Sequence, residues 1–358
     1  MRGLSASTSY PSLHAPPGEE RAPTLRFYWE LVRGRSTHRI EPIAFLLQPG
    51  LRPALAALRQ CTHAALRVSV LVELHERTAV EPCWRAAETL HAWGIGLDVW
   101  VHLADDDVRF LNTKTAARFQ ELLLPFLDRL QKDTYGRQVG VSLDIEPGLD
   151  TLEAAWRVTN GASLLDKAKG IGNVARGLWS HALSARQGHR DLKELASDLA
   201  ARNVEVHAAV MPPLLPSHLP GREAVQHWLL GCPVLGEEGA PLFPRQAALC
   251  YAPLLARAGL GRAAQHETFS LWAARHRQSF DAVVVGLLST GLLHDEPVYA
   301  DPAHLRQDLA AARALGFTDI GVYSLEGLLF GPAGDPVDVE KPQLRDDLGA
   351  WLAALAVV

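Results

Sequence analysis

The sequence has no apolar run approaching the roughly 18 residues needed to span a bilayer, which argues against a membrane-spanning helix. It also lacks a basic excess, because 35 Lys and Arg against 40 Asp and Glu give a net charge of −5, and this argues against a nucleic-acid partner. The four cysteines form no C-x-x-C pair and are expected to be free thiols. No secretory apolar core is visible near the N-terminus, so we expect a cytoplasmic protein with a loosely ordered leader over residues 1–40.

Several short catalytic motifs are missing as well. The segment after the first predicted strand reads Gln48-Pro49-Gly50, which is no Gly-rich phosphate loop. There is no H-E-x-x-H helix and no G-x-S-x-G elbow. We therefore expect no cofactor and no bound metal. What remains is a chain of 358 residues that is 48% hydrophobic and 21% charged, typical of a soluble globular protein with a large core.

Strand-like and helix-like segments alternate from about residue 42 to the end of the chain. The predicted strands cover residues 42–48, 66–74, 95–103, 139–147, 204–211, 247–252, 282–288 and 319–324. The predicted helices cover 51–59, 83–93, 115–131, 152–201 (broken near Gly161 and Gly188), 267–277, 302–315 and 343–355. Eight strands alternating with helices predict a single (β/α)8 TIM barrel over residues 41–358, with the doubly wound open sheet as the competing architecture.

In four of the predicted strands a regular apolar face alternates with a second face that carries most of the polar residues. In 139–147, for example, Val141, Leu143 and Ile145 alternate with Ser142, Asp144 and Glu146. The apolar face should meet the helices, so the other face should line the barrel. We predict that this lining gathers at the mouth of the barrel, where such folds carry their sites. Its expected members are Glu73, His75, Trp100, His102, Asp144, Glu146, His207, Met211, Tyr251 and Tyr323.

Asp144 and Glu146 are the centre of this set. Residues i and i+2 of a strand share a face, with their Cβ atoms roughly 7 Å apart. Two carboxylates this close resist joint ionisation, so one of them should hold a proton near neutral pH. Cleavage of a glycosidic bond needs such an acid to protonate the leaving oxygen. The pair predicts Glu146 as the acid and the deeper Asp144 as its partner.

The strand-4 segment resembles the family 18 glycoside hydrolases, the chitinase-like barrels, which carry D-G-x-D-x-D-x-E on this strand. Gly140, Asp144 and Glu146 match that pattern. The resemblance implies that Glu146 is the general acid and that Asp144 holds the substrate's acetamido group. A strand-6 tyrosine of the family corresponds to Tyr251, which would position the reacting group. Tyr323 stands on strand 8, where the family usually has tryptophan under the sugar.

Three functions stay open at this point. The first is a glycoside hydrolase, in which Glu73, His75, Trp100, His102, His207, Met211 and Tyr323 would form the substrate pocket around Asp144, Glu146 and Tyr251. The second is a metal-dependent sugar isomerase, epimerase or hydrolase, since His and carboxylate donors fall on neighbouring strands. The third is a barrel that binds sugar without cleaving it, because Val139 and Ser142 stand where the family has Asp. All three imply a carbohydrate partner, and none implies a nucleic acid or a membrane.

Overall fold

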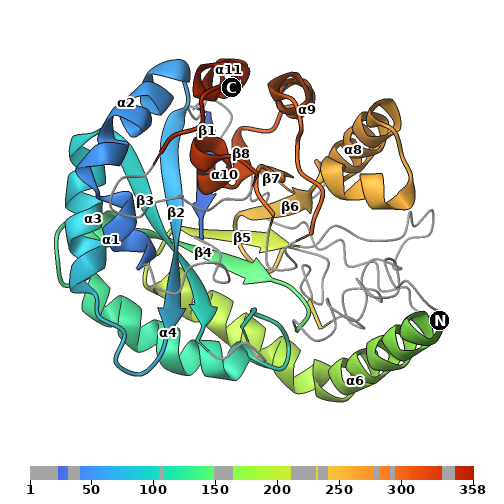
Figure 1. The fold of residues 1–358 in the computed structure, drawn as a ribbon. Coiled ribbons are helices and arrows are strands. Elements are labelled where there is room, and N and C mark those ends of the chain that lie inside the picture. The colour runs from blue at the N-terminus through green and yellow to red at the C-terminus, as the bar shows by residue number, and fades with distance from the viewer. Residues whose placement is uncertain are drawn as a thin grey trace, which may run out of the picture.

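A computed structural model describes residues 23–30, 41–104, 109–148, 164–210, 231–232, 241–277, 280, 282–290, 295–332 and 343–358. Eight parallel strands form a closed barrel in which each strand pairs with the next and the last pairs with the first (Figure 1). The strands are β1 Thr24–Trp29, β2 Ala65–Leu74, β3 Ile95–Leu103, β4 Gly140–Ile145, β5 Val206–Val210, β6 Gln246–Cys250, β7 Ala282–Gly286 and β8 Asp319–Tyr323. The predicted (β/α)8 barrel is therefore confirmed.

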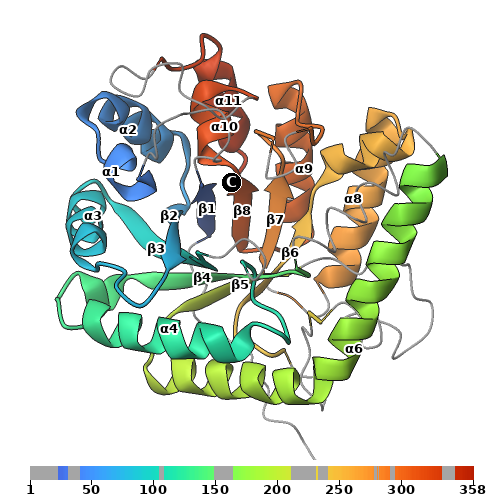
Figure 2. The same cartoon turned by 60° about the horizontal axis from the view of Figure 1, so that its bottom comes forward.

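The helices lie around the outside of this barrel (Figures 1 and 2). They are α1 Pro42–Leu46, α2 Arg52–Cys61, α3 Glu81–Ala92, α4 Ala116–Leu130, α6 Leu164–Ala201, α8 Arg262–His276, α9 Pro302–Ala314, α10 Leu325–Phe330 and α11 Leu348–Leu355. The described residues also form the short 3-10 helices η1 Pro49–Leu51, η3 Gly136–Gln138 and η4 Ala252–Ala258. Figure 2 shows α4 and α6 running side by side below β4 and β5.

The first strand differs from the sequence-based expectation. Residues 42–48 were expected to form it, but Pro42–Leu46 is the helix α1, with Pro42 in its first turn and Glu41 accepting a hydrogen bond from the Ala44 N–H. The strand is instead Thr24–Trp29, which falls inside the expected leader, so the barrel begins well before residue 41. Leu25, Phe27 and Trp29 are buried, and the apolar run of 42–48 belongs to the covering layer. The rest of the expected leader, residues 1–22 and 31–40, lies outside the described residues.

The helix α6 also corrects a prediction, because it continues through Gly188 where a break was expected. The expected break near Gly161 lies outside the described residues. The glycine at 188 serves close packing: a Cβ atom built there would lie only 1.9 Å from the Thr113 carbonyl oxygen and 2.5 Å from its carbonyl carbon. Both are backbone atoms of the segment that leads into α4. Gly188 therefore allows α6 to approach this segment.

This contact predicts opposite effects of alanine at two glycines of the same helix. Gly188→Ala should lower the free energy of unfolding by about 1–3 kcal/mol, because the new methyl group meets backbone atoms. Gly172→Ala is the matched control: nothing lies within 4 Å of its Cβ position, and alanine there should stabilise by up to about 1 kcal/mol. Urea unfolding of both variants measures the difference. Equal effects of the two substitutions would contradict the packing role of Gly188.

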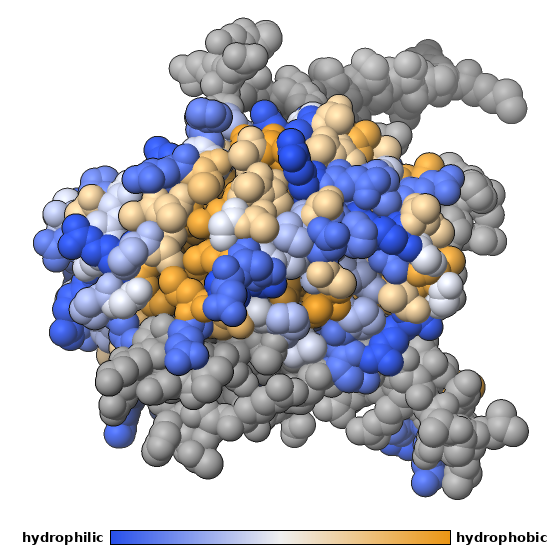
Figure 3. Space-filling model, turned by 45° about the horizontal axis from the view of Figure 1, so that its top comes forward, coloured by the Kyte–Doolittle hydropathy of each residue, from blue (hydrophilic) through white to orange (hydrophobic). Residues whose placement is uncertain are grey.

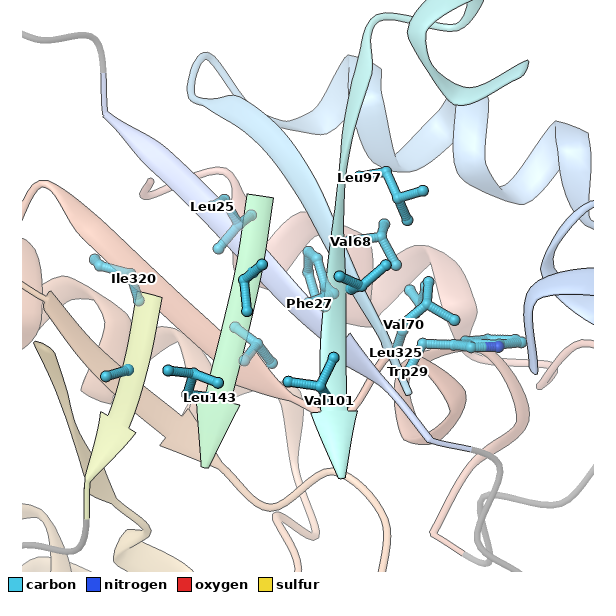
Figure 4. Packing of buried hydrophobic residues seen from close by; sticks show 14 of the residues in the cluster. Leu25, Phe27, Trp29, Val68, Val70, Leu97, Val101, Leu143, Ile320 and Leu325 are labelled. Carbon is cyan, nitrogen blue, oxygen red and sulfur yellow. The ribbon is translucent and has the colours of Figure 1, made fainter. Parts of the chain in front are cut away.

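Apolar side chains form one layer outside the barrel strands and another inside the barrel. The larger lies between the barrel and its helices and includes Leu25, Phe27, Val68, Val101 and Leu143 (Figure 4). The smaller fills the barrel interior, and its members are Tyr28, Leu71, Trp100, Ala209, Ala247, Leu249, Ala282, Val284, Leu287 and Tyr323. Since successive residues of a strand point to opposite sides, the alternation seen in the sequence correctly separates these two layers.

Charged residues occupy the barrel interior near the N-terminal ends of the strands. Arg26 of β1 is fully buried and is ion-paired with Asp98 of β3 and, at 3.1 Å, with Asp319 of β8. Arg67 of β2 binds the same Asp98 at 2.5 Å. The hydroxyl groups of Ser69 and Ser142 lie 2.8 Å apart just above. We call Arg26, Arg67, Asp98 and Asp319 the ionic floor of the barrel.

The outer surface is mixed in character. Figure 3 shows hydrophobic residues interrupted by hydrophilic ones on the face that tilts forward from the top of Figure 1. Among the helices whose residues are described, none combines the length and the apolar character that crossing a membrane requires.

Candidate active site

Acidic side chains meet where β1 to β4 end. Glu30 directly follows β1, Glu73 is the penultimate residue of β2, and Asp144 and Glu146 lie at the end of β4. In the sheet register Glu73 lies opposite His102 of β3. Because all eight strands are parallel, their C-terminal ends share one mouth, opposite the ionic floor. This is the end of a (β/α)8 barrel at which active sites form.

Asp144 and Glu146 differ in depth. Asp144 is buried, with 7% of its surface exposed, whereas Glu146 is half-buried. Burial, followed by the charge of Glu30, raises the pKa of Asp144 to about 8. Burial, followed by the charges of Asp144 and Glu30, raises the pKa of Glu146 well above its usual range. The two carboxyl groups therefore act as a coupled pair that retains a proton at neutral pH, and Glu146 is the more accessible member.

The segment between β3 and α4 holds the end of β4 in place. The Leu111 N–H donates to the Asp144 carbonyl at 3.0 Å, which extends the sheet by one parallel bridge to Ile145. The Asn112 amide donates to the Glu146 carbonyl at 3.1 Å. These bonds fix the backbone that carries both carboxyl groups. After residue 148, the description of the chain resumes at residue 164.

His102 and Arg109 lie behind the carboxyl pair. The Arg109 Nε–H donates to His102 Nδ1 at 3.0 Å, and its Nη2 lies 3.5 Å from Glu30 and 4.0 Å from Glu73. The other ring nitrogen of His102, Nε2, lies 3.6 Å from an oxygen of Asp144. Burial and the neighbouring Arg109 charge lower the pKa of His102 to about 3, so this ring is neutral.

Aromatic rings line one side of the mouth. Trp100 packs edge-on against Tyr28 and Tyr323, with ring centroids 5.1 and 6.1 Å apart, and Tyr251 lies 6.0 Å from Tyr323. The Tyr323 hydroxyl donates to Glu30 at 2.5 Å. Tyr251 directly follows β6 and is half-buried, and burial together with the charges of Asp144 and Glu146 raises its pKa. Trp100 and Tyr323 are buried, so Tyr251 is the most accessible of these three.

Seven of the ten residues expected from the sequence gather at this mouth: Glu73, Trp100, His102, Asp144, Glu146, Tyr251 and Tyr323. The other three do not join them in the described structure. His75 is exposed in the turn after β2, where its Nδ1 accepts from the Arg77 N–H at 3.1 Å. His207 lies deeper, with its ring 3.2 Å from the Tyr28 hydroxyl and 3.9 Å from Asp319. Met211 lies outside the described residues.

Sequence reasoning missed three residues of the site. Tyr28 and Glu30 were absent because residues 24–30 were assigned to the leader, although Arg26, Tyr28 and Glu30 alternate with three apolar residues as in the other strands. That alternation is the signal by which they could have been found. Arg109 stands in a loop, where no periodicity marks a residue that points into a site.

Within the part of the chain that the structure describes, no three His, Cys, Asp or Glu side chains are placed to hold a metal ion together.

Comparisons with known proteins support the fold. Neither a protein-family model nor a curated protein matches this sequence. Among solved structures, the chain is similar to a GH5-4 broad-specificity endoglucanase from an uncultured bacterium, with a TM-score of 0.52, 14% identity, and 92% of this chain and 93% of that chain covered. This likeness agrees with the (β/α)8 barrel.

Two further structures cover nearly the whole chain with TM-scores of 0.49 and 11% identity. The glycoside hydrolase domain of PgaB from Bordetella bronchiseptica matches 91% of this chain and 99% of that chain. The catalytic domain of a hyperthermophilic chitinase from Pyrococcus furiosus matches 93% of this chain and 94% of that chain.

Proposed function

We propose that this barrel hydrolyses a glycosidic bond, with Glu146 as the general acid and Asp144 as its partner. The observation that carries the proposal is the carboxyl pair at the barrel mouth. Burial and the charge of Glu30 raise the pKa of Asp144, and burial with the charges of Asp144 and Glu30 raises that of Glu146. An acid must still hold its proton at the working pH in order to donate it to the leaving oxygen. The raised pKa of Glu146 favours this protonated state, and Glu146 is more exposed than Asp144.

The surrounding side chains suit a sugar. Aromatic faces next to hydrogen-bonding groups are a common surface for binding a polar ring, because the apolar face packs while the edge donates or accepts. Tyr251 would position the reacting group beside the pair, and Glu73 would bind a hydroxyl group at the rim, where 20% of its side chain is exposed. Trp100, His102 and Tyr323 form the wall behind them. Met211 stays a proposed member of the pocket from sequence alone, whereas His75 and His207 lie away from the carboxyl pair.

The carboxyl pair also makes a prediction about stability that needs no substrate. An Asp is usually half-protonated near pH 3.9 in an unfolded chain. With the pKa of Asp144 at about 8, the folded chain binds more protons than the unfolded chain between about pH 4 and 8. Stability from this pair is therefore present at the acidic end of that window and is lost as the pH rises, by about 1.4 kcal/mol per pH unit for each retained proton. Asp144→Asn should reduce this slope.

Urea unfolding at pH 5, 6.5 and 8 measures the slope for the two proteins. Asp133→Asn is a control carboxylate outside the barrel mouth, and we expect it to leave the slope unchanged. An Asp144→Asn protein with the same slope as the wild type would contradict the raised pKa.

A panel of aryl glycosides that differ in sugar and anomer tests the function itself. We expect the wild-type chain to release the aryl group from at least one of them, and Glu146→Gln to lose this activity. Turnover that is unchanged in Glu146→Gln would rule out the acid role. Tight binding of an oligosaccharide with no cleavage after long incubation would favour the sugar-binding alternative, for which Ser142 is the motivating residue.

A metal-dependent sugar isomerase, epimerase or hydrolase stays the other alternative, although the described residues give it no ligand cluster. Elemental analysis of the purified protein discriminates the metal-dependent enzyme from the proposed glycosidase. Stoichiometric zinc, manganese or magnesium would favour the metal-dependent enzyme.

A further inference from the structure

Arg109 reaches the barrel mouth from a loop that backbone hydrogen bonds hold on both sides. The Leu103 N–H at the end of β3 donates to the Arg109 carbonyl at 3.0 Å, and the Leu111 N–H donates to the Asp144 carbonyl at 3.0 Å. The Thr115 hydroxyl also donates to the Phe110 carbonyl at 2.7 Å. Arg109 itself is only 5% exposed. Its guanidinium is therefore built into the wall, unlike a surface arginine that samples many rotamers.

The contact between Arg109 and His102 determines which ring nitrogen carries the proton. A guanidinium has only donors, so the 3.0 Å bond from Arg109 Nε–H requires His102 Nδ1 to accept. A neutral imidazole with an accepting Nδ1 carries its hydrogen on Nε2. Edge-on contacts with Trp100 and Phe110, at 4.8 and 5.2 Å between ring centroids, fix the plane of the ring.

The Nε2–H of this tautomer faces the carboxyl pair. Nε2 lies 3.6 Å from Asp144 Oδ2 and has no hydrogen-bond partner among the described residues. Asp144 Oδ1 is likewise without one. A small movement of Asp144 toward His102 would convert this approach into a hydrogen bond. Long hydrogen bonds in active sites commonly shorten in this way when a substrate binds.

We propose that Arg109 is a positioning residue that fixes His102 as the neutral Nε2–H tautomer, so that the ring offers Asp144 a hydrogen bond without a positive charge. The proposal deepens the proposed function and rests on Asp144 and Glu146 being the working pair. An imidazolium beside Asp144 would draw its proton away, because an opposite charge at this distance favours the ionised carboxylate. A neutral donor orients the carboxyl group and leaves the shared proton in the pair.

Nitrogen-15 NMR of the histidine rings in the full-length chain tests this assignment directly. Long-range proton–nitrogen spectra distinguish the two neutral tautomers and the imidazolium, and the signal that disappears in His102→Gln identifies His102. We expect the neutral Nε2–H pattern at pH 7, unchanged down to pH 5. An Nδ1–H tautomer or an imidazolium at pH 7 would overturn the proposal. The tautomer is read from the wild-type chain, and His102→Gln serves only to assign the signal.

A second experiment records the same spectra for the Arg109→Met variant. Without the guanidinium, His102 Nδ1 is free to bind a proton, so we expect mixed tautomers or a ring that titrates between pH 5 and 8. Arg129→Met is the matched control, because Arg129 donates to the Thr78 carbonyl at 3.0 Å from α4 and should leave the His102 signals unchanged. An unaltered His102 pattern in Arg109→Met would contradict the role of Arg109.

Activity gives an independent readout where a cleaved substrate is found. Arg109→Met should lower kcat by about 10- to 100-fold with little change in KM, since a displaced catalytic group costs rate more than binding. The ring spectra do not depend on turnover. A failure of the proposed glycosidase activity would therefore leave the tautomer result standing, and a wrong tautomer would leave the Glu146 test unaffected.

Discussion

Glu146→Gln should slow the cleavage of aryl glycosides by about 10²- to 10⁴-fold when the leaving phenol is a weak acid. Glutamine keeps the size of the side chain and can donate a hydrogen bond, but it cannot transfer a proton. The loss should shrink steadily as the leaving phenol becomes more acidic, because such a group departs without protonation. Steady-state kcat/KM for wild type and variant across a series of substituted phenyl glycosides measures this dependence.

Glu121→Gln is the matched control for this series. Glu121 is exposed on α4, where it pairs with Arg118 at 2.7 Å, and its substitution should leave every kcat/KM unchanged. A Glu146→Gln loss that is the same for all leaving groups would indicate a binding or structural role, and would contradict the proposed proton transfer.

Asp98→Ala should lower the free energy of unfolding by about 3–5 kcal/mol, the largest effect on stability that we expect. Asp98 is almost fully buried and binds both Arg26 and Arg67. Its removal leaves the buried Arg26 with Asp319 alone, at 3.1 Å. A buried charge that loses its partner costs far more than the pair contributed, because it cannot return to water in the folded chain. Urea unfolding, followed by a spectroscopic signal that reports on the whole barrel, measures the change in the free energy of unfolding.

Asp128→Ala provides the comparison at the surface. Asp128 pairs with Arg202 at 2.9 Å but is 57% exposed, so its removal should cost less than about 1 kcal/mol. Similar losses in the two variants would contradict the view that burial makes the loss of a charge partner costly in the ionic floor.

The sequence predicted the barrel well because most of its strands obey one simple rule. In β2, β3 and β4 apolar residues alternate with polar ones, and the closed sheet places them in the outer layer and the interior respectively. The first strand obeys the same rule over residues 24–29, but the apolar run of α1 at 42–46 also fits a short buried strand and misled the prediction. Local apolar content cannot distinguish a short buried helix from a buried strand.

The residues of the candidate site that lie on strands were predictable from the same alternation. Asp144, Glu146 and His102 follow from alternation, because a strand fixes the side on which each residue lies. His207 shares the parity of Asp144 but stands one pair of residues deeper, so its ring meets Tyr28 near the floor. Arg109 depends on the path of a loop, and His75 depends on where β2 ends, and neither can be read from periodicity.

The protonation of Glu146 is the central claim, and carbon-13 NMR of the side-chain carboxyl groups measures it most directly. Titration of the full-length chain labelled in glutamate, with Glu146 assigned by its absence in Glu146→Gln, gives the pKa of this one group. We predict a midpoint well above the value of about 4.3 that is usual for glutamate, because burial and the charge of Asp144 both oppose ionisation. In Asp144→Asn that midpoint should fall. A wild-type midpoint near 4.3 would show that Glu146 is ionised at neutral pH and would contradict its role as the acid.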